Sequence, residues 1–237
     1  MDTRSGHIVW DWNGTLLHDT DVVLEATNAS CAEIGLPPLT LEQYRELYCV
    51  PVPRFYGKLL GRQPSAEEWE AMDAAFRRHY GAGADRAALA EGAAELLLSW
   101  KTGGGTQSVC SLAPHERLVP WLGRLGLDGH FERVDGDTGV TGPLRGKARQ
   151  MARHLAAMPH VDRLRTVVIG DAADDAAAAA HAGAKAVLYT GGSHSRQGLK
   201  RVGVPVVDSL ADAVEAAAEL VARAGPRPPA RTPEDPV

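Results

Sequence analysis

Short runs of apolar residues recur along the chain, and most of them end in a polar residue. The runs span 7–11 (HIVWD), 106–111 (TQSVCS), 166–171 (TVVIGD), 186–190 (AVLYT) and 204–208 (VPVVD). Near-continuous apolar runs of this length are typical of strands buried in a parallel sheet, and helical patterns lie between them. The pattern predicts an α/β fold with a Rossmann-like, doubly wound parallel sheet.

The interval 18–85 has a different pattern, with several helix signals and no convincing strand. The segments TLEQ (40–43) and SAEE (65–68) have the spacing of capping boxes, which begin helices. One helical face after the second box carries large apolar residues, namely Trp69, Met72, Phe76 and Tyr80. We interpret this stripe as core packing. The interval is predicted to form a small all-helical cap domain inserted after the first strand.

These patterns divide the chain into three parts. We expect residues 1–17 and 86–222 to form the catalytic core and residues 18–85 the cap. The Pro-rich segment 223–237 lacks an apolar pattern and is expected to be a disordered tail. The alanine run at 176–180 is expected to form a small-residue helix that packs close to the sheet.

Composition narrows the class of protein. The 237 residues include 25 Lys and Arg against 30 Asp and Glu, a formal charge of -5, which argues against a nucleic-acid surface. No apolar stretch is long enough to span a membrane, and the N-terminus does not resemble a signal peptide, so we expect a cytoplasmic protein. Three widely spaced cysteines favour reduced thiols. The oligomeric state, monomer or homodimer, stays open.

Chemically active residues follow the predicted strands. The first strand ends at Asp11, the second at Ser111 and the third at Asp171, with Asp175 four residues later. Lys147 lies at the start of a predicted helix between the second and third strands. Because ligands of an open α/β sheet bind beyond the carboxyl ends of its strands, we expect these side chains to meet.

Two carboxylates at one sheet edge would repel each other unless a cation lies between them. Mg²⁺ favours oxygen ligands and often combines one or two carboxylates with phosphate oxygens. A serine hydroxyl and a lysine beside that site suit phosphoryl transfer to a carboxylate, which forms an aspartyl-phosphate. The expected ligand is therefore a small phosphate ester.

The motifs that carry these residues resemble those of the haloacid dehalogenase superfamily, in its phosphatase branch with a helical cap. DWNGTL (11–16) resembles the nucleophile motif, SVCS (108–111) the second, Lys147 the third, and GDAADDAAAAAHAG (170–183) the acidic fourth. The cap is similar to that of phosphoglycolate-phosphatase-like members. Dehalogenases of the superfamily lack the paired acids of the fourth motif, so GDAADD points away from dehalogenation.

The resemblance implies a role for each matching residue. One group would hold Mg²⁺: Asp11, which is also the nucleophile, Asn13 through its backbone carbonyl, Asp171 and Asp175. A second group would bind the transferring phosphoryl group: Ser111, Leu112 and Lys147. Asp174 matches no required position.

Asn13 departs from the family pattern, because most phosphatases of this type carry Asp there. That Asp protonates the leaving alcohol and then activates water, and an amide does neither at neutral pH. Its loss typically costs about 10²–10⁴-fold in rate. We therefore expect a phosphatase that is slow, that favours good leaving groups, or that takes its proton from the substrate, from water or from the cap. His18, Asp19 and Asp21 lie near the expected hinge and are candidate donors.

Other interpretations of the amide remain open. Phosphonoacetaldehyde hydrolases resemble this chain in having a non-acid at that position and use a cap lysine to form a Schiff base. Lys58 is the only lysine of the inserted segment, although YGKLLG does not match their motif. The chain also fits a catalytically weak phosphate-ligand binding or regulatory protein. Deamidation of the Asn13–Gly14 pair to Asp would restore the usual motif.

Overall fold

A six-stranded sheet forms the centre of the computed structural model, which describes residues 6–139 and 146–224. The strand order is β5-β4-β1-β6-β7-β8, and every neighbouring pair is parallel. The strands are β1 (His7–Trp10), β4 (Thr106–Pro114), β5 (Val134–Asp137), β6 (Thr166–Gly170), β7 (Lys185–Tyr189) and β8 (Val206–Val207). Because β1 lies between β4 and β6, the chain winds to one side of it and then to the other.

All five apolar runs contribute strands to this sheet, but two strands differ from the prediction. The strand β4 continues three residues past Ser111 to Pro114, and its pairing with β5 shifts register over that stretch. The strand β5 was not predicted, because its sequence VDGD carries two acids and one glycine. An edge strand needs fewer apolar side chains than a central one, which explains why periodicity missed it.

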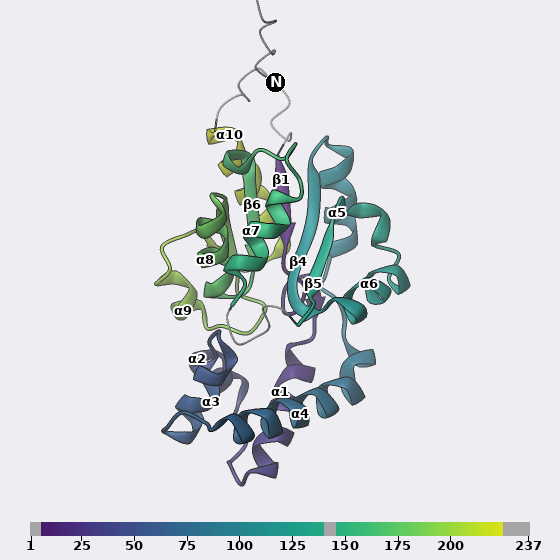
Figure 1. Cartoon of the computed structure of the whole chain (residues 1–237). Helices are drawn as coiled ribbons and strands as arrows, with labels where there is room; N and C mark the ends of the chain where they lie inside the picture. The colour runs from purple at the N-terminus through teal and green to yellow at the C-terminus, as the bar shows by residue number, and fades with distance from the viewer. Residues whose placement is uncertain (1–5, 140–145, 225–237) are drawn as a thin grey trace, which may run out of the picture.

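Helices cover both faces of the sheet, as predicted (Figure 1). One face is packed by α5 (Ala93–Thr102), α6 (His115–Arg124) and α10 (Leu210–Arg223). The other is packed by α7 (Ala148–Ala156), α8 (Ala173–Ala182) and α9 (Arg196–Lys200). Short 3₁₀ turns complete the core at η2 (Asp128–His130) and η3 (Arg163–Arg165). The doubly wound α/β class is therefore confirmed.

The alternation of β1 shows how one strand serves both layers. Ile8 and Trp10 point into the cluster under α5, α6 and α10, whereas Val9 points into the cluster under α7 and α8. On that second face, the alanine run forms α8, and Ala178 and Ala179 are fully buried. Small side chains let this helix lie close to the sheet, as its composition predicted.

Four helices gather beyond the carboxyl ends of the strands, at the lower end of the molecule in Figure 1. They are α1 (Thr20–Glu33), α2 (Leu41–Leu47), α3 (Val52–Leu60) and α4 (Ala66–Gly83), followed by the turn η1 (Ala84–Arg86). Both predicted capping boxes are present, at the starts of α2 and α4. These helices have a buried cluster of their own, made of Cys31, Tyr44, Phe55, Tyr56 and Met72. We refer to residues 20–86 as the cap helices.

The cap helices join the core at a two-stranded antiparallel sheet. Its strands are β2 (Leu17–His18) and β3 (Ala88–Leu89), one on each connection. The domain boundaries expected at 17/18 and 85/86 fall at or beside these strands. They stay a prediction, because a division into separate domains requires a measurement of relative motion.

The aromatic stripe of α4 is only partly core. Met72 is buried in the cap cluster and Trp69 packs against it. Trp69 also borders the cavity between cap and core. Phe76 and Tyr80 lie outside the cap cluster, stack on each other with ring centroids 5.7 Å apart, and line the same cavity. The interpretation of the stripe as packing was therefore wrong for these two rings, which continue the same helical face beyond the cap cluster.

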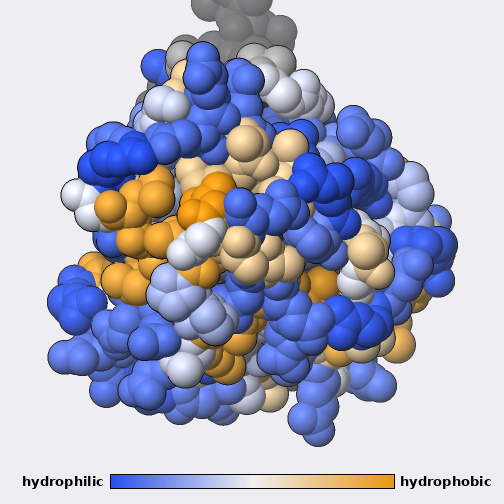
Figure 2. All heavy atoms as spheres, turned by 90° about the horizontal axis from the view of Figure 1, so that it is seen from below, coloured by the Kyte–Doolittle hydropathy of each residue, from blue (hydrophilic) through white to orange (hydrophobic). Residues whose placement is uncertain are grey.

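Seen from the cap end, the molecule is largely hydrophilic, with hydrophobic atoms gathered toward one side (Figure 2). Within the described ranges, no helix is long and apolar enough to cross a membrane. The expected tail begins at residue 223, but α10 includes Arg223, so the helix runs one residue further than predicted. The remainder of that tail, residues 225–237, lies outside the described residues.

Candidate active site

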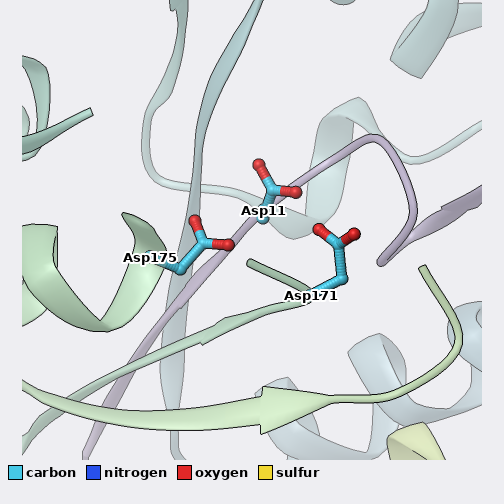
Figure 3. Close-up of side chains that lie close together, drawn as sticks. All are labelled: Asp11, Asp171 and Asp175. Carbon is cyan, nitrogen blue, oxygen red and sulfur yellow. The ribbon is translucent and has the colours of Figure 1, made fainter. Parts of the chain in front are cut away.

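Three carboxylates from separate parts of the sequence converge at the carboxyl edge of the sheet. Asp11 follows β1, Asp171 follows β6, and Asp175 lies in the first turn of α8. One oxygen from each lies within 4.8 Å of the others, and the three side chains point toward a common space (Figure 3). The sequence predicted that Asp11 and Asp171 would meet there, and the structure brings them together.

Burial makes this cluster electrostatically costly. All three carboxylates are buried. Burial, reinforced by the charges of Asp11 and Asp175, raises the pKa of Asp171 well above its usual range. Burial likewise raises the pKa of Asp11, with Lys147 opposing the shift. One lysine cannot neutralise three acids, so the all-oxygen donor set fits a divalent cation that would offset the remaining charge.

Lys147 supplies the positive charge of this cluster. Its ammonium lies 2.5 Å from Asp11 Oδ1 and also contacts Asp175 Oδ1. Although burial opposes the charged form, the two carboxylates raise the pKa of Lys147 well above its ordinary value. Its backbone N–H donates to Asp174 Oδ2 at 2.7 Å. Asp174, which matched no motif position, therefore anchors the start of α7 and places Lys147.

Two glycines leave room for the side chain of Asp171. A Cβ added at Gly192 would lie 2.1 Å from Asp171 Oδ2, and one added at Gly14 would lie 2.7 Å away. Gly14 also has φ +71°, a conformation that other residues rarely adopt. On the same side, the backbone N–H of Ser193 donates to Asp171 Oδ2 at 2.5 Å. The carboxylate is thus held in one orientation.

Ser111 and Leu112 lie where the register of β4 shifts, and both line the cavity in front of the carboxylates. The Ser111 hydroxyl oxygen accepts a hydrogen bond from Ala113 N at 3.1 Å, which leaves its own O–H as a donor. The Ser111 carbonyl accepts from Gln150 Nε2 at 2.7 Å. Packing of α7 against β4 therefore fixes the backbone that presents these two residues.

The Asn13 side chain turns toward the cap helices. Its amide nitrogen donates to Asp19 Oδ2 at 2.6 Å and to the Tyr80 hydroxyl at 2.9 Å. Tyr80 in turn donates to the same Asp19 oxygen at 2.7 Å, and Gly14 N donates to the other at 2.8 Å. Burial nevertheless raises the pKa of Asp19. A carboxylate at position 13 would face the carboxylate of Asp19, whereas the amide of Asn13 donates a hydrogen bond to it.

The other residues considered for proton transfer or Schiff-base chemistry lie elsewhere. His18 and Asp21 are exposed, so Asp19 is the one member of that group that reaches the site. Lys58 is also exposed, and its ammonium donates to Leu47 O at 2.7 Å. Lys58 lines a separate surface hollow on α3, not the cavity in front of the carboxylates.

A cavity of about 310 Å³ separates the carboxylates from the cap helices. Its cap side is largely aromatic, which the sequence analysis did not predict. Aromatic rings that line the cavity include Tyr48, Phe55, Trp69, Phe76 and Tyr80 from the cap, and Trp121 from α6. The aromatic face of α4 is the sequence feature that could have indicated this wall. However, a row of aromatic residues on a helix does not show whether the face is packed in a core or lines a cavity.

Arg45 on α2 joins the cap helices to the core loop that holds Asp171. Its guanidinium donates to Gly192 O at 2.8 Å and to Gly191 O at 3.2 Å. The Arg45 carbonyl accepts from Ser195 N at 3.1 Å. Together with the hydrogen bond from Tyr80 to Asp19 and the ring contact of Tyr48 with His194, these contacts attach the cap to the core beside the carboxylate cluster.

Comparison with known proteins agrees with this geometry. The chain is 29% identical to the phosphoglycolate phosphatase of Caulobacter vibrioides over 232 residues, covering 93% of this chain and 94% of that protein. It is 28% identical to a phosphoglycolate phosphatase of Cupriavidus necator over 218 residues, covering 90% and 92%. The crystal structure of a predicted phosphatase from Clostridium acetobutylicum shares the fold, with a TM-score of 0.77, 19% identity, and coverage of 91% of this chain and 99% of that chain.

The family assignment follows from the residues matched. Residues 6–183 fit the model of the haloacid dehalogenase-like hydrolases, a span that includes the three carboxylates, Ser111 and Lys147. The resemblance inferred from the four motifs is thereby confirmed, as is the expectation of an enzyme. The chain belongs to the haloacid dehalogenase-like hydrolases.

Proposed function

We propose that the chain is a Mg²⁺-dependent phosphatase that hydrolyses a small phosphate ester through an aspartyl-phosphate on Asp11. The observation that carries the proposal is the convergence of Asp11, Asp171 and Asp175 with Lys147 at one sheet edge, facing the cavity beneath the cap helices. Relatives named phosphoglycolate phosphatase support the reaction class. In this role, Asp11, Asp171, Asp175 and the Asn13 backbone carbonyl would hold the ion.

The reaction would begin with substrate placement. The Ser111 hydroxyl, the backbone at Leu112 and the Lys147 ammonium would hold the phosphoryl oxygens. Bound Mg²⁺ would supply positive charge for the phosphoryl group as negative charge develops. An Asp11 carboxylate oxygen attacks phosphorus, and the bond from phosphorus to the ester oxygen breaks with its electron pair on that oxygen. Water then attacks phosphorus, which releases phosphate and restores the Asp11 carboxylate.

Proton supply is the distinctive feature of the proposed site. Asn13 has no proton to give at neutral pH, and its amide is committed to Asp19 and Tyr80. The leaving oxygen would therefore depart without the usual aspartic acid beside it. Esters whose leaving groups are stable as anions should react best.

A carbon–phosphorus hydrolase is less well supported. Schiff-base chemistry would need Lys58 to face the phosphoryl site, but its ammonium is exposed and bound to a carbonyl. The remaining alternative is a protein that binds phosphate ligands without hydrolysing them, and the experiment below distinguishes it from an enzyme.

The test is phosphate release from a panel of phosphate esters and phosphonates, with and without Mg²⁺, by wild type and Asp11→Asn. We expect Mg²⁺-dependent turnover that Asp11→Asn lowers by about 10⁴-fold or more, as removal of a nucleophile does. The exposed Asp21→Asn variant is the matched control and should retain wild-type activity. Ligand binding without turnover in wild type would reject the phosphatase proposal in favour of a binding role.

A further inference from the structure

The cap side of the cavity offers aromatic rings where a leaving group would sit. Phe76 and Tyr80 stack with an interplanar angle of 17°, and Tyr48, Phe55 and Trp69 belong to one network of ring contacts. Rings already fixed by their neighbours lose little freedom when a further ring packs among them. The wall therefore suits a flat apolar group.

The charged groups of the cap side are already paired. Arg77 lines the cavity, but its guanidinium lies 2.8 Å from Asp73 on the preceding turn of α4. Arg45 is engaged by the carbonyls of the core loop. On the core side, Arg117 of α6 also lines the cavity, and its positive charge acts on the Tyr80 hydroxyl. The cap-side arginines are therefore engaged, and a leaving group that carries a carboxylate would have Arg117 as its cation, so a carboxylate-bearing ester is the comparison substrate in the test below.

The amide at position 13 supports the same conclusion independently. A phenol has a pKa of about 10, several units below the value of about 15.7 for water, which alkyl alcohols resemble. A phenolate therefore leaves readily without a proton donor, whereas an alkoxide does not. A site that lacks the usual acid is suited to aryl esters, and its cavity is lined with rings.

We infer that the substrate is a small aryl phosphate, in which a phenolic oxygen carries the phosphoryl group and the ring packs against the cap aromatics. This inference rests on the proposed function. Attack by Asp11 breaks the bond between phosphorus and the phenolic oxygen, the electron pair leaves on that oxygen, and the phenolate takes its proton from water. The cavity of about 310 Å³ is of the size that suits a small free molecule, and we choose this over a phosphorylated tyrosine on a protein chain.

The first experiment measures binding without turnover. Phenylphosphonate and methylphosphonate share a phosphonate group and resist hydrolysis of an ester, so calorimetric titration in Mg²⁺ isolates the contribution of the ring. We expect wild type to bind the phenyl compound about tenfold more tightly or better, from apolar burial and ring packing. Phe76→Leu, which keeps an apolar side chain, should reduce that ratio severalfold, and the exposed control Glu70→Ala should not.

The second experiment measures turnover. We expect kcat/KM for phenyl phosphate to exceed that for ethyl phosphate, phosphoglycolate and a phosphotyrosine peptide. Equal binding of the two phosphonates, or phosphoglycolate as the better substrate, would overturn the inference while leaving the phosphatase proposal intact. A preferred phosphotyrosine peptide would overturn the choice of a small molecule. Preferential binding of phenylphosphonate with no ester hydrolysed would reject the proposed function but keep the aryl specificity of the cavity.

Discussion

The two sides of the cavity are built from opposite kinds of side chains. The core side presents three buried carboxylates and one lysine, at the ends of strands and the starts of helices, whereas the cap side presents aromatic rings on helices. The charged side is held by backbone contacts such as Ser193 N to Asp171. The apolar side is held by ring packing. On the proposed function, the core would supply the reaction and the cap would select the group that leaves.

The largest test of the charged side removes the lysine that contacts two of its carboxylates. Lys147→Met leaves Asp11 and Asp175 buried beside each other without the ammonium that they both contact. Loss of one partner from a buried ion pair lowers the free energy of unfolding by about 3–5 kcal/mol. Chemical denaturation without divalent ions measures this loss, and added Mg²⁺ should recover part of it if the carboxylates bind the ion.

An exposed lysine provides the matched control for that experiment. Lys200→Met at the end of α9 should change stability by less than about 0.5 kcal/mol. Similar losses in the two variants would contradict the view that the carboxylate cluster depends on Lys147. A Lys147→Met protein insensitive to Mg²⁺ would argue against a metal site at these carboxylates.

The second test alters Asn13, whose side-chain amide contacts both Asp19 on the core side and Tyr80 on the cap side. Asn13→Asp would place a carboxyl where the amide now lies 2.6 Å from Asp19 Oδ2. Two carboxyls at that distance share a proton, so one of them has a raised pKa and can act as a general acid. We expect hydrolysis of ethyl phosphate to increase by about 10²-fold, and phenyl phosphate to gain much less.

The unequal gain on alkyl and aryl esters can be measured from how kcat/KM depends on the pKa of the leaving group. A series of substituted phenyl and alkyl phosphates should give a steep dependence of kcat/KM on leaving-group pKa in wild type and a shallower one in Asn13→Asp. Asn13→Ala, which cannot donate a proton, should keep the steep dependence. Equal slopes in all three proteins would show that position 13 does not control proton transfer.

The charged side of the cavity could be predicted from sequence, because its residues have a local signal. Asp11, Ser111 and Asp171 each follow an apolar run, and parallel strands bring their carboxyl ends to one edge whatever lies between them. The spacing of Asp171 and Asp175 places both at the start of one helix. Site residues at strand ends can therefore be predicted from a few neighbouring residues of the sequence.

The apolar side could not be predicted in the same way. The stripe on α4 is continuous in sequence, yet Met72 packs within the cap and Phe76 faces the cavity. Which part of a helical face meets another body depends on how α4 is placed against the core, and periodicity carries no such information. Arg45, which holds that placement, is one arginine among many in the sequence.

A third test loosens the junction between the two sides. Arg45→Ala removes the side-chain hydrogen bonds to Gly191 and Gly192 and should weaken cap attachment by about 1.5–3 kcal/mol, as for hydrogen bonds from a charged group. Native-state hydrogen exchange should then show faster exchange in α2 with little change in the central strands. Arg54→Ala, on the exposed side of α3, is the control. Equal exchange in both variants would show that Arg45 does not fix the cap.

The smallest test uses pH and two buried histidines of the core, one at its junction with the cap and one inside it. His194 lies in the core loop with its ring centroid 5.3 Å from that of the cap residue Tyr48, and burial lowers its pKa from 6.5 to about 4, with Asp175 raising it and Lys58 lowering it. His7 lies inside the core, where burial lowers its pKa to about 3. For both, the unfolded or opened state binds the proton more readily below pH 6.5, so stability is full above that pH and is lost as pH falls.

The two histidines should destabilise different regions of the molecule as the pH falls. Each can contribute up to about 1.4 kcal/mol per pH unit, His194 between about pH 6.5 and 4 and His7 down to about pH 3. Because His194 touches the cap, acidification to pH 5 should lower the protection factors of amides in α2, measured against the intrinsic exchange rate at the same pH, before it lowers those of the sheet. His194→Gln should remove this early opening. His7→Gln should instead flatten the pH dependence of global unfolding. If the cap and the sheet lost protection together in wild type, the junction would not be the weaker of the two regions, and His194 would not control the attachment of the cap.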